Sequence, residues 1–369
     1  MHLAWLHWDP PRFIFTLPFI HHPIAWYGVC FAIGFILGFF IILPMIRQKL
    51  SQTEKILPRD IASWPHVVQS LRQVSGKKEH PLYPIYQKLS QKTRENLNRL
   101  KIKQEPVELT KNDILQAVNH SYLAYGREKL EKLFGKGLLT LKELAVLLTD
   151  RLTWYIVIGT VVGARLGHVF FYEWPRYQQN PLEIIKVWEG GLASHGGALG
   201  VILALFLYQR SIREKFPEFN FLCLLDILCV PTAMTAVWIR IGNFMNQEII
   251  GPVTTAPWAV VFAHPLEAEG GLPRHPTQLY EAFCYLITFI FLYTLWSRKR
   301  NQLKPGVLIG LFMILVFGSR FFVEFVKVSK GLMIDESFLL TGQYLSLPFI
   351  ILGIFLLFCG KKLSKSSIF

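Results

Sequence analysis

Residues 188–208 read WEGGLASHGGALGVILALFLY. The second half is strongly apolar and is typical of a helix that lies in lipid. The first half places two glycine pairs around His195, although glycine lowers the stability of a helix. A histidine at membrane depth must be hydrogen-bonded or hydrated. Two interpretations are open: an irregular turn that contains a histidine, or a turn that holds the imidazole for chemistry.

The rest of the chain supports a membrane location for this stretch. Of the 369 residues, 52% are hydrophobic, and the mean hydropathy is +0.34. Apolar runs long enough to cross a bilayer recur, which predicts an all-α polytopic membrane protein. We expect about seven spans, at residues 24–46, 152–172, 194–209, 221–240, 279–297, 305–326 and 345–360.

The distribution of charge predicts the orientation in the membrane. A net charge of +14 fits nucleic acid in principle, but the short segments 298–304 and 361–369 carry +4 and +3, whereas 241–277 carries −2. An excess of Lys and Arg marks the cytoplasmic side. We therefore expect an outer N-terminus, a cytoplasmic C-terminus and no nucleic-acid partner.

Composition also divides the chain. We expect an outer N-terminus and first helix at 1–46, a helical insert at 47–150, a membrane body at 151–360 and a tail at 361–369. The insert carries 19 Lys and Arg against 11 Asp and Glu, so its surface either contacts anionic lipid or is simply solvated. TKND (110–113) and TLKE (140–143) resemble capping boxes. A small outer head is expected at about 241–278, with a strand-like run at 258–263.

Several kinds of chemistry lack their sequence signatures. All five cysteines fall within predicted spans and none forms a CxxC pair, which argues against a disulfide framework or a cysteine metal site. The sequence has no HExxH, GxSxG or P-loop motif. We expect neither a metal nor a dissociable cofactor.

Ionisable residues gather near the outer ends of the predicted spans. Arg165, His195 and Arg240 lie there, as do Arg320 and Glu324, which are four residues apart on one helix face. Each has a structural alternative: arginines snorkel to the interface, and Arg320 with Glu324 forms an ion pair. Their convergence on one leaflet favours a site. Guanidinium groups bind phosphate and a histidine moves protons near neutral pH, so the pattern indicates chemistry on a phospholipid.

The chain resembles the prolipoprotein diacylglyceryl transferase family in five stretches that occur in this order: GARLGHVFFY (163–172), VWEGGLASHGGALG (187–200), RIGNFMNQEIIG (240–251), HPTQLYEAF (275–283) and GSRFFVEF (318–325). The resemblance implies a body of seven helices in the bacterial inner membrane, with a periplasmic head, N-terminus and site. It implies transfer of a diacylglyceryl group from phosphatidylglycerol to the lipobox cysteine of a prolipoprotein signal peptide, with release of glycerol phosphate and without a cofactor.

The resemblance also implies roles for residues. His195 is the candidate base, and Arg240 and Arg320 are the candidate catalytic arginines. Glu324 is expected to orient Arg320. The full set expected to bind substrate is Tyr27, Arg165, Gly196, Asn243, Glu248, Gly251 and Glu324. The glycines beside His195 are expected to bring the backbone close to the lipid headgroup, with the next helix beginning after His195.

Three departures from the family pattern leave questions open. The insert replaces what is usually a short cytoplasmic loop, and its role is unknown. Val316 stands where many relatives carry an aromatic hydroxyl. His168 stands where relatives often have tyrosine, so it competes with His195 as the base. Two other functions are also open: a lipid or anion transporter, although the sequence shows no internal repeat, and an inactive relative.

Overall fold

The computed structural model describes residues 5–11, 13–16, 23–101, 103–266, 268–327 and 339–363. Residues 364–369 of the predicted tail lie outside this part. The chain divides into two compact units, of which one comprises residues 1–42 with 151–369 and the other residues 43–150. We call the first the membrane body and the second the insert, and describe each by itself.

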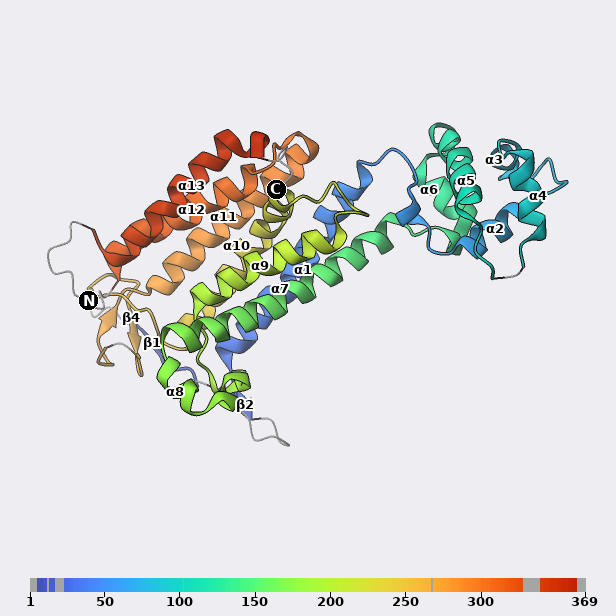
Figure 1. The fold of residues 1–369 in the computed structure, drawn as a ribbon. Helices are drawn as coiled ribbons and strands as arrows, with labels where there is room; N and C mark the ends of the chain where they lie inside the picture. Colours follow the sequence, from blue (N-terminus) through green and yellow to red (C-terminus); the bar gives the residue numbers. More distant parts are fainter. Residues whose placement is uncertain are drawn as a thin grey trace. The chain divides into compact units, whose positions relative to one another are not determined.

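Long helices make up the membrane body (Figure 1). They are α1 (Trp26–Ser51), α7 (Leu141–Phe171), α9 (Ser194–Ile212), α10 (Phe221–Met245), α11 (Thr277–Lys299), α12 (Val307–Val323) and α13 (Thr341–Leu363), of which α1 and α7 continue into the insert. In the described part of the chain, six helices are long and apolar enough to cross a membrane, all of these except α9. The prediction of a polytopic all-α membrane protein is confirmed, whereas its count of seven spans is not.

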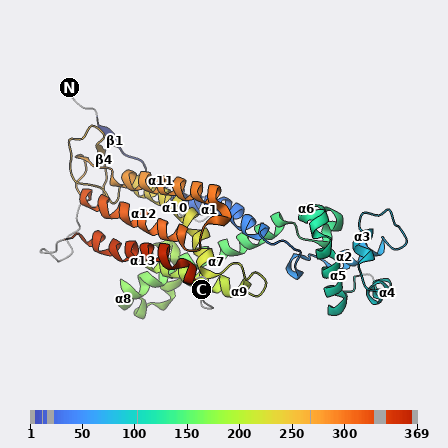
Figure 2. The same ribbon diagram turned by 90° about the horizontal axis from the view of Figure 1, so that it is seen from above.

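Helices α10, α11, α12 and α13 pack side by side in sequence order (Figures 1 and 2). Asp226, an acidic residue inside α10, is explained by this packing. Its carboxylate accepts hydrogen bonds from the backbone amides of Gly306 (2.7 Å) and Ile309 (2.9 Å), where α12 begins. The free amides at a helix N-terminus carry partial positive charge. These two hydrogen bonds therefore offset the free energy that it costs to bury a carboxylate within a membrane helix.

Glycine and alanine allow α7 and α9 to approach closely. Gly159, Gly163 and Gly167 on α7 face Gly196 and Gly200 on α9. A Cβ atom added at Gly163 would lie 2.5 Å from the Gly196 carbonyl oxygen, and one added at Gly159 would lie 2.7 Å from the Gly200 carbonyl oxygen. Small residues spaced four apart permit such backbone contact between membrane helices. The glycine-rich opening of α9 therefore has a packing role.

A small β-structured head lies next to the membrane helices. Strand β4 (Val260–Phe262) pairs in parallel with β1 (Leu6–Trp8) and antiparallel with β5 (Pro273–Arg274), while β2 (Phe13–Thr16) pairs with β3 (Pro23–Ala25). The strand-like run at 258–263 does form a strand. The sequence does not reveal that the N-terminal segment joins this head. Trp8 stacks on Phe244 at 4.5 Å and donates to its carbonyl oxygen at 3.0 Å.

The insert has a hydrophobic core of its own. Its helices are α2 (Trp64–Arg72), α3 (Tyr83–Gln87), α4 (Gln91–Arg99), α5 (Glu108–His120) and α6 (Tyr122–Phe134). Fully buried residues such as Leu71, Ile85 and Ile114 pack together at its centre. The capping box at TLKE is confirmed, because Thr140 and Glu143 exchange hydrogen bonds at the start of α7. The one at TKND is wrong, because Thr110 lies inside α5 and is buried.

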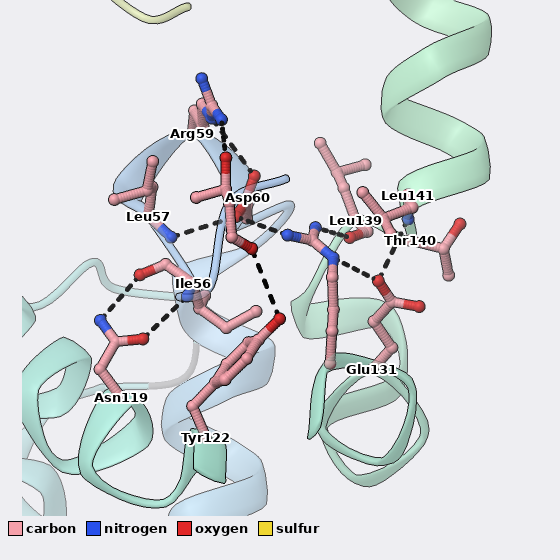
Figure 3. Close-up of polar contacts among 12 residues, drawn as sticks. Ile56, Leu57, Arg59, Asp60, Asn119, Tyr122, Glu131, Leu139, Thr140 and Leu141 are labelled. Carbon is pink, nitrogen blue, oxygen red and sulfur yellow. Dashed lines mark hydrogen bonds and ion pairs between the residues drawn. The ribbon is translucent and has the colours of Figure 1, made fainter. Parts of the chain in front are cut away.

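A polar network stabilises the loops of the insert (Figure 3). Asp60 is buried and accepts a hydrogen bond from Arg127 at 3.0 Å, and Arg127 also donates to Glu131 at 2.7 Å. The Asn119 amide forms two 2.8 Å hydrogen bonds with the backbone of Ile56. The network joins the chain segment before α2 to helices α5 and α6.

Removing one partner of the buried Asp60–Arg127 pair should destabilise the insert. Asp60→Ala removes one of the two carboxylates that pair with the buried Arg127 guanidinium and leaves only Glu131, which costs about 3 kcal/mol. Hydrogen exchange followed by mass spectrometry on the full chain should show faster exchange over residues 56–61 and 122–134. Lys132→Ala, which removes an exposed pair with Glu128 on the same helix, is the control and should leave exchange unchanged. Equal exchange in wild type and Asp60→Ala would contradict the assignment.

Candidate functional site

Arg240 lies near the end of α10 and is held on two sides. Its Nε lies 2.9 Å from Glu281 Oε2, and its Nη1 donates to Asn243 Oδ1 at 3.0 Å. The Asn243 amide in turn donates to Glu248 Oε1 at 2.8 Å. This arrangement joins three residues of the RIGNFMNQEIIG stretch with α11. Arg240, which is 13% exposed, is thereby fixed in one orientation.

Glu281 is the most deeply buried charge near Arg240. It is completely buried, and it pairs with Lys327 at 3.0 Å as well as with Arg240. Tyr285, one helical turn further along α11, donates to it at 3.4 Å. Lys327 also pairs with Glu324 at 3.4 Å. We call Arg240, Glu281, Tyr285, Arg320, Glu324 and Lys327 the arginine cluster.

Arg320 differs from Arg240 in having no partner among the described residues. Among the residues that the structure describes, none forms a hydrogen bond or ion pair with Arg320, and its Nε is buried. Arg320 lies within electrostatic range of Tyr285, which places it in the arginine cluster. The expectation that Glu324 orients Arg320 is corrected, because Glu324 pairs with Lys327 instead. A buried guanidinium nitrogen without an acceptor requires an anion or water to satisfy it.

Tyr27 and Gly251 flank this cluster. Tyr27, in the first turn of α1, lies within electrostatic range of Arg240 and Glu248, and its ring packs against Gly242. Gly251 donates its N–H to the His275 carbonyl oxygen at 2.9 Å, and a Cβ atom there would lie 2.8 Å from the Val326 carbonyl oxygen. Glycine at 251 therefore lets the head contact the segment that carries Lys327.

Position 316 packs against apolar neighbours. Val316 contacts a buried group formed by Val237, Ala282 and Tyr285. Tyr285 places an aromatic hydroxyl in the arginine cluster, although Val316 itself has none.

The segment around His195 forms a separate group. Helix α9 begins at Ser194, so His195 lies in its first turn, which corrects the expectation that the helix begins after it. The exposed His195 ring lies 5.4 Å from the ring of Phe171 and 5.7 Å from that of Tyr172. In the described part of the chain, no hydrogen bond or ion pair connects His195 with the arginine cluster. The structure brings Arg240, Asn243 and Glu248 together but leaves His195 apart from them.

His168 is more enclosed than His195. Its ring stacks on Tyr172, with centroids 5.7 Å apart, and lies 3.7 Å from the carboxylate of Glu173. A Cβ atom added at Gly191 would lie 2.7 Å from His168 Nε2, so this backbone turn covers the ring. The geometry favours a packing role for His168.

Arg165 holds a loop of the protein, and its role in binding substrate stays a prediction. Its Nε donates to the Ile184 carbonyl oxygen at 2.9 Å and its Nη1 to that of Gly190 at 2.7 Å, while its Nη2 donates to that of Glu183. The buried guanidinium also lies over the Tyr177 ring. All its nitrogens are occupied by the loop between α7 and α9, in which Gly190 and Gly191 have positive φ.

Gly196 packs closely against α7, and its predicted contact with substrate stays a prediction. A Cβ atom there would overlap the Gly163 carbonyl oxygen and lie 2.7 Å from the Cα of Gly167. We expect Gly196→Ala to lower the free energy of unfolding by about 1–3 kcal/mol, because α7 and α9 must move apart. Thermal denaturation in detergent measures this. At Gly197 the nearest atom would be 3.5 Å away, so Gly197→Ala is a matched control that should melt like wild type. Equal melting of the two variants would refute close packing at Gly196.

Comparison with known proteins identifies the family. A family model described as prolipoprotein diacylglyceryl transferase matches residues 130–359. The chain is 46% identical over 358 residues to the phosphatidylglycerol–prolipoprotein diacylglyceryl transferase of Protochlamydia amoebophila (strain UWE25), covering 95% of this chain and 94% of that protein. The chain belongs to the prolipoprotein diacylglyceryl transferase family. It is therefore a multi-pass membrane transferase.

Other relatives with the same name match a smaller share of the chain. The proteins of Tolumonas auensis and Chloroherpeton thalassium are 47% and 44% identical, over 58% and 57% of this chain and 79% and 76% of their own lengths. The Protochlamydia transferase aligns with 95% of the chain, so its match takes in most of the insert. The insert is thus shared with at least one transferase of this family.

Sequence reasoning did not assign three residues of the arginine cluster to the site. Glu281 belongs to the HPTQLYEAF stretch, and Tyr285 follows it by four residues on the same face of α11. Lys327 follows Arg320 and Glu324 by seven and three residues. Helical spacing was the available signal for Glu281 and Tyr285, and the short distance along the sequence from Arg320 and Glu324 was the signal for Lys327.

Proposed function

We propose that this chain transfers the diacylglyceryl group of phosphatidylglycerol to the cysteine thiol of a prolipoprotein lipobox, the first step of lipoprotein maturation. The family name supports the two substrates. The observation that carries the proposal is the buried Nε of Arg320, which has no partner among the described residues and shares the surroundings of Tyr285 with the fixed Arg240. A phosphodiester in an apolar helical body fits this pair of guanidinium groups.

The reaction has a simple balance of bonds. The cysteine thiol loses its proton to a base, and the thiolate sulfur attacks the glyceryl carbon that bears the phosphate oxygen. A C–S bond forms and the C–O bond breaks, and its electron pair goes to the phosphate oxygen. The phosphodiester monoanion becomes glycerol phosphate, with one more negative charge. Arg320 stabilises that charge as it develops, because its unused N–H donors are in place before the reaction.

His195 is the proposed base. A thiol with a pKa of about 8.5 is mostly protonated at neutral pH, so deprotonation accelerates its attack. The exposed ring of His195 is able to reach a substrate thiol, whereas His168 is enclosed by Tyr172, Glu173 and Gly191. The rings of both histidines lie 5.7 Å from the ring of Tyr172. An incoming lipobox cysteine has to reach both His195 and the arginine cluster.

The proposed orientation follows the charges of the short loops. The N-terminus, the head and the arginine cluster lie on the periplasmic side of the bacterial inner membrane, and the C-terminus is cytoplasmic. The head joins the N-terminal strand β1 to the segment between α10 and α11, so both belong on one side. Access from the outer leaflet suits a membrane-anchored acceptor.

The released product tests the donor. Purified protein in detergent is supplied with a lipobox peptide and phosphatidylglycerol labelled in its terminal glycerol, and soluble glycerol phosphate is measured. We expect labelled glycerol phosphate in an amount equal to the modified peptide, and none with a peptide in which serine replaces the cysteine. Release of label in the presence of the serine peptide at the same rate would indicate a phospholipase that hydrolyses the phosphodiester instead of a transferase.

A further inference from the structure

We propose that Glu281 is a positioning residue that also sets the charge of the anion site, and that Lys327 is its counter-charge. This inference rests on the proposed function and extends it to residues that do not contact the reacting atoms. Glu281 is completely buried, and its two oxygens face different cations, Oε2 facing Arg240 and Oε1 facing Lys327. A structural ion pair needs only one such partner.

The contacts of Glu281 join several elements. Arg240 comes from α10, Glu281 from α11 and Lys327 from the segment after α12. Lys327 continues the chain of charges to Glu324, whose carboxylate contacts the first turn of α13 at Gly342. Glu281 therefore connects the outer ends of the helices that carry Arg240 and Arg320. Its position determines where the Arg240 guanidinium points.

The second proposed role of Glu281 is to set the net charge of the anion site, and it follows from the charges of the arginine cluster. Arg240, Arg320 and Lys327 contribute three positive charges, and Glu281 and Glu324 two negative ones. Counted within the arginine cluster, and without Glu248, which lies one hydrogen bond further away beyond Asn243, one positive charge is unneutralised. By the contacts it belongs to Arg320, which has no partner among the described residues. A single free positive charge suits a phosphodiester monoanion. A second free positive charge would bind the more negative product, glycerol phosphate, too tightly and would slow its release.

The hydrogen bonding of Glu281 agrees with this role. Its Oε2 lies 2.9 Å from Arg240 Nε but accepts no hydrogen bond within the described residues, so the contact is an ion pair without a linear bond. The Arg240 N–H groups are therefore not all consumed by Glu281. Glu281 neutralises and orients Arg240 and still leaves it able to donate to a ligand.

Glu281→Gln tests both roles at once. The substitution keeps the shape of the side chain and removes one negative charge from the cluster. We expect turnover to fall about 10- to 100-fold, because a misplaced catalytic group costs up to about 100-fold. We also expect the free product, glycerol phosphate, to bind about tenfold more tightly, because the site gains a net positive charge in a region of low dielectric. Calorimetric titration with glycerol phosphate measures the binding independently of activity.

Two further variants separate charge from position. Glu281→Gln with Lys327→Met restores the net charge, so the affinity for glycerol phosphate should return to within about threefold of wild type while turnover stays low. Glu281→Asp keeps the charge but shortens the side chain, so it should lower turnover without tightening product binding. Glu183→Gln, which removes one partner of the half-exposed pair with Arg176, is the matched control and should change neither.

The outcomes distinguish this inference from the proposed function. If wild type forms no thioether product, the proposed function fails. If wild type is active and Glu281→Gln shows unchanged turnover and unchanged affinity for glycerol phosphate, the inference is overturned. A loss of turnover with unchanged affinity in the single variant would also overturn the charge role. If Glu281→Gln does not fold, unchanged turnover in the folded Glu281→Asp variant would overturn the positioning role.

Discussion

Arg320→Ala should lower turnover about 100- to 1000-fold and leave the melting temperature unchanged. Removal of one donor that stabilises developing negative charge typically has an effect of this size. Stability should be spared because no described residue forms a hydrogen bond or ion pair with Arg320, so no partner is left behind. Initial rates with phosphatidylglycerol and a lipobox peptide, together with thermal denaturation, measure the two quantities.

Matched variants sharpen this prediction. Arg320→Lys keeps the charge but loses the planar fork of donors, so it should retain more activity than alanine and less than wild type. Arg165→Ala should show the opposite pattern, with a lower melting temperature, because its guanidinium holds several backbone carbonyl groups. A stable Arg320→Ala variant with wild-type turnover would remove Arg320 from the site.

His195→Asn should lower turnover at neutral pH about 100- to 1000-fold, because general base catalysis contributes on that scale. The residual rate should rise about tenfold for each pH unit between 6 and 8, since the thiolate fraction of the peptide then sets the rate. Initial rates across this pH range measure both effects. If the substitution only disturbed the structure, the rate would fall without this steep dependence on pH.

His168→Asn is the comparison for the base. It should keep turnover within about tenfold of wild type, because the His168 ring packs between Tyr172 and Tyr177 and is not free to reach a substrate. If His168→Asn has the larger defect and the steeper pH profile, the roles of the two histidines are exchanged. If both variants retain near-full rates, another group deprotonates the thiol.

Much of the fold follows from the sequence because lipid imposes simple requirements. An apolar run of about 20 residues predicts a membrane helix, and the predicted runs at 221–240 and 279–297 lie inside α10 and α11. The parallel pairing of Leu6–Trp8 with Val260–Phe262 was not predictable, because short strands far apart in the chain leave no periodic signal. The insert was predicted as helical from its capping signals, although one of its two predicted caps was wrong.

In the candidate site, too, some features were predictable from the sequence and others were not. Motifs identified Arg240, Asn243 and Glu248, and the structure places these three in one hydrogen-bonded chain. The glycines beside His195 show a limit of the sequence, because glycine permits the close approach of a ligand and also that of another helix. The contact of Gly196 with Gly163 and Gly167 demonstrates the second use, which the sequence pattern does not reveal. The partners of Glu324 depend on where α12 ends, which periodicity cannot resolve to one residue.

The chemical linkage formed on the acceptor peptide distinguishes transfer of a diacylglyceryl group from transfer of an acyl group. Purified wild-type protein is incubated with phosphatidylglycerol and a lipobox peptide, and the peptide is analysed by mass spectrometry before and after treatment with hydroxylamine. The account predicts a mass gain of one diacylglyceryl group on the cysteine that survives hydroxylamine, because a thioether has formed by cleavage of the C–O bond. An unmodified peptide, or a single acyl group removed by hydroxylamine as a thioester, would contradict it.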